Sequence, residues 1–93
     1  MDKNTLLIFA KRIFSSSSEA KAVMSLRQLK TLLEEQGAPR GDIALLDKMI
    51  ASAPEMKAAA NRATLTEADV EIADRRAKER KAREAAASYR GRC

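Results

Sequence analysis

The 93-residue sequence contains no histidine, no tryptophan and a single cysteine, Cys93. Histidine is the commonest general base and a frequent metal ligand, so its absence removes the usual basis for an active site. One cysteine can build neither a zinc site nor an internal disulfide. No glycine-rich phosphate loop is present, because Gly37 and Gly41 flank a proline in a short connection. We therefore expect a non-enzymatic protein without metal or cofactor.

Long apolar runs are also missing. The longest one near the start, residues 6–10, ends at Lys11 and Arg12, so it is too short for a signal-peptide core or a membrane span. A single cysteine fits a reducing compartment. These two observations predict a cytoplasmic protein with no membrane span.

Glycine and proline are scarce, with three and two residues, and no run of β-branched or aromatic residues suits a strand. Alanine contributes 18 residues, and Leu, Glu, Lys and Arg are abundant, which is a helix-forming composition. Apolar periodicity predicts helices over approximately residues 4–14, 18–36, 42–52, 53–63 and 67–88. We expect an all-α fold, a small four- to five-helix bundle with a projecting, highly charged basic C-terminal helix.

Turn and cap residues mark the predicted helix ends. Gly37 supplies a left-handed residue to end the second helix, and Asp42 is the expected N-cap of the third. Thr66 and Asp69 have the spacing of a capping box that opens the last helix. No apolar stripe continues after Ala77, so we predict a helical bundle domain over 1–77 and a basic helical extension over 78–93.

Charge is distributed unevenly along the chain. Residues 1–74 carry ten Lys and Arg against eleven Asp and Glu, whereas residues 75–93 carry eight against two, a net charge of +6. Guanidinium groups suit phosphate contacts, and an aromatic ring can stack on a base. The predicted binding residues for nucleic acid or an acidic partner are Arg75, Arg76, Lys78, Arg80, Lys81, Arg83, Tyr89, Arg90 and Arg92.

A simpler interpretation is that these charges only support a solvated helix. Acids crowd the first turns and bases the last, which suits the helix dipole. Three acid–base pairs at i,i+4, each with the acid first, would also stabilise such a helix. The pairs are Glu71–Arg75, Asp74–Lys78 and Glu79–Arg83.

The leading hypothesis is a small regulatory or accessory protein that binds nucleic acid or a nucleoprotein complex through the basic helix. The alternative is a protein–protein adaptor or inhibitor, of the kind that mobile elements encode, with or without homodimerisation. Its interface would include Ile8, Phe9 and Phe14, and the basic helix would steer it to an acidic protein surface. An anionic membrane is a weaker candidate, because the basic helix has no apolar face to insert. A helix-turn-helix over residues 26–50 is disfavoured by Asp42 and Asp47 on its second helix.

Overall fold

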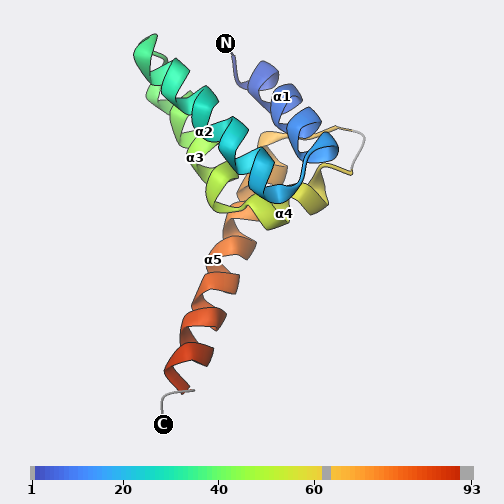
Figure 1. Ribbon diagram of the computed structural model, residues 1–93, viewed down its shortest axis with the longest axis vertical. Coiled ribbons are helices and arrows are strands. Elements are labelled where there is room, and N and C mark those ends of the chain that lie inside the picture. The colour runs from blue at the N-terminus through green and yellow to red at the C-terminus, as the bar shows by residue number, and fades with distance from the viewer. Residues whose placement is uncertain (1, 62–63, 91–93) are drawn as a thin grey trace.

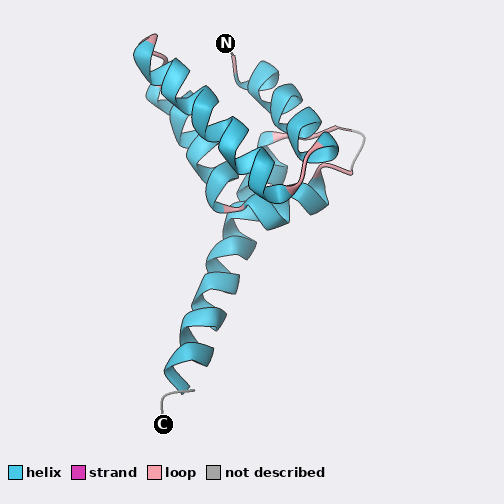
Figure 2. Ribbon diagram, in the orientation of Figure 1, coloured by secondary structure: helices cyan, strands magenta, loops and turns pink. Residues whose placement is uncertain are grey.

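The computed structural model describes residues 2–61 and 64–90, with the backbone alone for residues 88–90. Every regular element in this part of the chain is an α-helix (Figure 2). The helices are α1 (Lys3–Ser16), α2 (Glu19–Glu35), α3 (Arg40–Ala51), α4 (Ala53–Ala59) and α5 (Glu67–Arg90). The predicted fold class, a small all-α bundle, is confirmed.

The bundle lies at one end of the molecule and a single helix leaves it. Helices α2 and α3 run side by side, α1 packs against both, and α4 lies across the end of the bundle from which α5 emerges (Figure 1). The first part of α5 packs against α3 and α4. Its second part projects from the bundle, and the molecule therefore measures 49 Å along its longest axis against 30 and 23 Å along the other two.

One apolar cluster holds the bundle together, and all five described helices contribute to it. Its members fall on single faces of their helices, which is the pattern expected for amphipathic helices around a common core. The largest fully buried apolar side chains are Phe14, Leu6, Leu26, Leu46, Met49, Met56 and Val70.

Local cap chemistry sets several helix ends. Gly37 has φ +71°, so α2 ends on a left-handed glycine as predicted. The capping box of α5 is also confirmed: Thr66 N–H donates to Asp69 Oδ2 at 2.9 Å, and Asp69 N–H donates to Thr66 Oγ1 at 3.3 Å. The N-cap expected at Asp42 is wrong. Helix α3 already begins at Arg40, because the carbonyl of Pro39 accepts the first helical hydrogen bond from the N–H of Ile43 at 3.3 Å, and Asp42 is buried in the first turn.

Helix α4 is shorter than predicted. It ends at Ala59, whereas the sequence pattern favoured a helix to residue 63. Ala60 closes the last turn by donating its N–H to the carbonyl of Met56 at 2.9 Å, and Asn61 follows in a turn. Residues 62 and 63 of the predicted helix lie outside the described residues.

Candidate nucleic-acid interface

The first three turns of α5 set the direction of the whole helix. Val70, Ala73 and Ala77 are buried against the bundle, and the capping box fixes the backbone just before them. Beyond Ala77, the described side chains are exposed up to residue 87, except for the half-buried Arg80. The packed half of α5 therefore holds a solvent-exposed, charged half in a defined direction.

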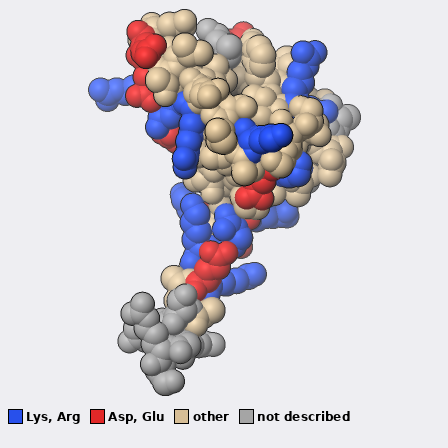
Figure 3. Space-filling model, viewed as in Figure 1, with Lys and Arg blue, Asp and Glu red and all other residues tan. Residues whose placement is uncertain are grey.

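Most of the predicted basic residues are exposed on this helix. In the space-filling view, Lys and Arg side chains gather around the part of α5 that leaves the bundle, with acidic side chains among them (Figure 3). Arg76 and Arg83 are seven residues apart, so they lie on nearly the same side of α5, about 10.5 Å apart along its axis. The exposed predicted residues are Arg75, Arg76, Lys78, Lys81 and Arg83.

Arg80 differs from the other predicted residues because it is bound to the bundle. Its Nε donates to Glu55 Oε2 of α4 at 2.8 Å, and its Nη2 donates to Glu55 Oε1 at 3.3 Å. Its Nη1 lies 3.5 Å from Glu84 Oε1. The hydrogen bond from Arg80 lowers the pKa of Glu55 below its ordinary value, although burial acts in the opposite direction. Arg80 is therefore the ion-paired link between α5 and α4, a contact that the sequence did not predict.

The ion pairs along α5 differ from those the sequence predicts. Asp74 pairs with Lys78 at 3.2 Å, as its spacing indicated. Glu71 instead binds Lys48 Nζ of α3, which leaves Arg75 without its predicted partner. The Glu79–Arg83 pair does not form. Four described cations of α5 have no ion pair within the described part of the chain, namely Arg75, Arg76, Lys81 and Arg83.

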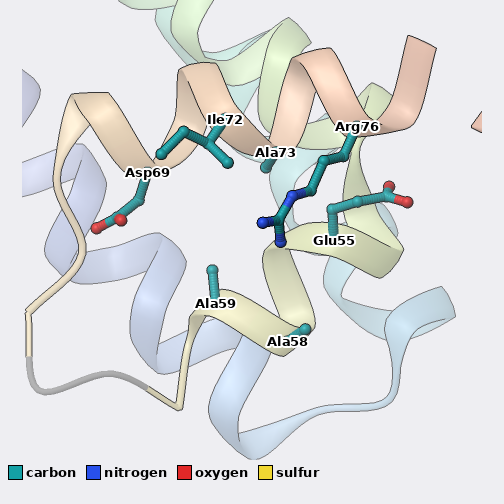
Figure 4. Close-up of a pocket in the computed structure, with 7 residues that line it drawn as sticks. All are labelled: Glu55, Ala58, Ala59, Asp69, Ile72, Ala73 and Arg76. Carbon is teal, nitrogen blue, oxygen red and sulfur yellow. The ribbon is translucent and has the colours of Figure 1, made fainter. Parts of the chain in front are cut away.

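A small hollow lies between α4 and the packed first half of α5. It has a volume of about 110 Å³ and is lined by four apolar and three charged residues, namely Ala58, Ala59, Ile72, Ala73, Glu55, Asp69 and Arg76. The guanidinium of Arg76 extends over this hollow, whereas the carboxylate of Glu55 points away from it (Figure 4). The carboxylate of Glu55 is ion-paired with Arg80. Arg76, which borders the same hollow, therefore has no ion pair with it.

The predicted apolar interface on α1 is only partly exposed. Ile8 and Phe9 are 59% and 44% exposed, so both are available to a partner. Phe14 is 0% exposed and belongs to the core, so its assignment to an interface is wrong. The sequence did not indicate that Met24 and Leu32 of α2 would also be strongly exposed.

Three predicted binding residues lie partly or wholly outside the described residues. The backbone of Tyr89 and Arg90 belongs to α5, but their side chains and all of Arg92 lie outside the described residues.

One residue of the site was missed by the sequence reasoning, namely Glu55. It lies 25 positions from Arg80, and no local spacing pattern connects the two.

The helix-turn-helix interpretation gains no support from the position of α3. This helix packs against the other four helices, with Leu45, Leu46 and Met49 buried. Asp47 Oδ1 lies 2.7 Å from Lys30 Nζ, and Lys48 is bound to Glu71. Its central charged residues therefore serve contacts within the bundle.

The fold and its charged extension define a small all-α protein with a projecting basic helix. None of the described helices combines the length and the apolar character required to cross a membrane. No family model matches the chain, and neither a curated protein nor a solved structure matches it significantly.

Proposed function

We propose that this is a non-enzymatic regulatory or accessory protein of the cytoplasm that binds nucleic acid, free or within a nucleoprotein complex, through the exposed basic side chains of α5. The observation that carries the proposal is a helix that leaves its bundle bearing four cations without an ion pair in the described chain. Arginine is weakly hydrated and presents a planar set of donors that matches a phosphate, so an unpaired arginine on a rigid support is suited to a phosphate backbone.

The geometry favours contacts to the backbone over contacts to bases. Arg76 and Arg83 lie on one side of α5. When α5 lies along the groove of a duplex or along a single strand of nucleic acid, both arginines can therefore point to its phosphates. No described aromatic side chain accompanies them on α5. We therefore expect binding that depends strongly on salt and little on base sequence.

Titration of duplex and single-stranded DNA at several salt concentrations tests the proposal. Two to four phosphate contacts predict a slope of log K against log salt of about −2 to −4 on a duplex. Replacing both Arg76 and Arg83 by alanine should reduce the magnitude of this slope by about 2.

The matched control replaces Arg27 and Arg40 by alanine. Both are exposed, lie on α2 and α3 away from the projecting helix, and have no ion pair in the described chain. This double variant removes the same two charges and should bind nearly as the wild type does. Absence of binding at about 50 mM salt, or equal losses in the two double variants, would refute the proposal.

A second candidate function, a protein–protein adaptor or inhibitor, rests on the exposed apolar pair of α1. Ile8 and Phe9 are adjacent and exposed, and such side chains are common in interfaces. Homodimerisation is the form that can be tested with the chain alone. Sedimentation from about 1 to 100 µM should then show a dimer that Ile8→Gln/Phe9→Gln dissociates, and a monomer throughout this range excludes self-association.

A further inference from the structure

Arg76, Arg80 and Arg83 line one open groove on α5, and carboxylates share it with them. The groove is bordered by Glu55 of α4 and by Glu79 and Glu84 of α5. The arginines are spaced by four and three residues, so they follow one another along the same side of the helix. Only the central arginine is ion-paired: Arg80 meets Glu55 through two hydrogen bonds and approaches Glu84.

The contact between Glu55 and Arg80 has the same form as a contact between a phosphate and arginine. A carboxylate and a phosphate both accept two parallel N–H donors from the planar guanidinium. Glu55 accepts from Nε and Nη2, which form one edge of the planar guanidinium, and Glu84 lies near the remaining nitrogen, Nη1. A phosphate that approaches Arg80 would thus meet occupied donors and a carboxylate of like charge.

We propose that Glu55 acts as an internal anion that withholds Arg80 from phosphate, so that the protein contains a three-arginine phosphodiester site whose central position is blocked by α4. This inference rests on the function proposed above and identifies the residue that limits its strength. The wild-type protein binds a phosphate backbone through Arg76 and Arg83 on this side of α5. Removing the charge of Glu55 frees the Nε and Nη2 donors of Arg80 for a phosphate and completes the row, while Glu84 stays beside Nη1.

Glu55→Gln is the informative substitution, because the amide keeps the shape of the side chain and one hydrogen-bond acceptor. Released Arg80 adds one charge-assisted phosphate contact, so the affinity for a DNA duplex at about 50 mM salt should rise about tenfold. The salt slope should steepen by about 0.9. Glu55→Ala is the second variant and should act in the same direction.

Glu79→Gln is the matched control, since Glu79 also borders the groove and has no ion pair in the part of the chain that the structure describes. It raises the net charge by the same amount without releasing an arginine, so the affinity should rise only about twofold. Equal gains for Glu55→Gln and Glu79→Gln overturn the inference, because general charge would then explain both.

A double-mutant cycle assigns the gain to Arg80. In a protein that already carries Arg80→Ala, adding Glu55→Gln should change the affinity no more than Glu79→Gln does. A tenfold gain that persists without Arg80 contradicts the inference. If neither the wild type nor Glu55→Gln binds DNA at about 50 mM salt, the proposed function itself fails. Circular dichroism of each variant confirms that its helix content is retained.

Discussion

Two phenylalanines on α1 provide the sharpest test of how the bundle is packed. Phe14 is 0% exposed and Phe9 is 44% exposed, although both lie on the same helix. Truncating a fully buried phenylalanine costs about 3–5 kcal/mol, because the apolar contact is lost and a cavity remains. Phe9 keeps about half of its surface in water, so its truncation should cost about 1 kcal/mol. Phe14→Ala and Phe9→Ala should therefore differ by about 2–4 kcal/mol.

Urea unfolding followed by circular dichroism measures this difference. A domain of this length has a total stability of about 5–14 kcal/mol, so Phe14→Ala removes a large part of it. Phe14→Leu, which keeps most of the volume, is the milder variant and should cost less than about 1.5 kcal/mol. Equal losses for Phe14→Ala and Phe9→Ala, at unchanged m-values, would show that the side chain of Phe14 is not enclosed as described.

Three further substitutions test individual contacts. Gly37→Ala should cost about 1 kcal/mol in urea unfolding, because its φ of +71° is unfavourable for alanine even though a Cβ would meet no atom within 4 Å; an unchanged stability contradicts this. Thr66→Ala should cost about 1 kcal/mol through loss of the α5 cap, and a loss below about 0.3 kcal/mol would argue against the capping box. Glu55→Gln should lower the Tm at neutral pH, and the gap from the wild type should narrow as the pH falls below about 4.3. The folded-state pKa of Glu55 is depressed, so its stabilisation is present above the unfolded value and is lost on protonation. A gap independent of pH would exclude the ion pair as its cause.

Features that depend on neighbouring residues could be predicted from the sequence. The glycine that ends α2 and the capping box of α5 are each decided within a few residues, by a backbone conformation or by an i,i+3 hydrogen bond. The start of α3 is also local, but two signals competed there. Asp42 resembles an N-cap, whereas Pro39 is equally suited to precede a first turn, and the helix begins after Pro39.

Features that depend on packing between helices could not be predicted. Periodicity places Phe9 and Phe14 on one broad apolar face of α1, but only the positions of the other helices decide which of them is enclosed. The same applies to ion pairs. Glu71 has a suitable partner four residues away in Arg75, yet it binds Lys48, 23 positions earlier in the chain.

The ion pairs that the bundle selects also bear on why α5 is so basic. An isolated helix of about a dozen residues is marginal in water, but the exposed half of α5 continues a packed helix and needs no separate nucleation. A helix that required only solubility and self-support would gain by pairing its charges at i,i+4. In this structure Glu71 pairs with Lys48 of α3 and not with Arg75. Arg80 pairs with Glu55 of α4, whereas Arg76 and Arg83, on either side of Arg80, have no ion pair in the described chain. Packing between helices thus decides which cations of α5 stay unpaired: Arg75 loses its i,i+4 partner, whereas Arg80 is neutralised. Four described cations of α5 remain without an ion pair, which is why we prefer a binding surface to a merely solvated helix.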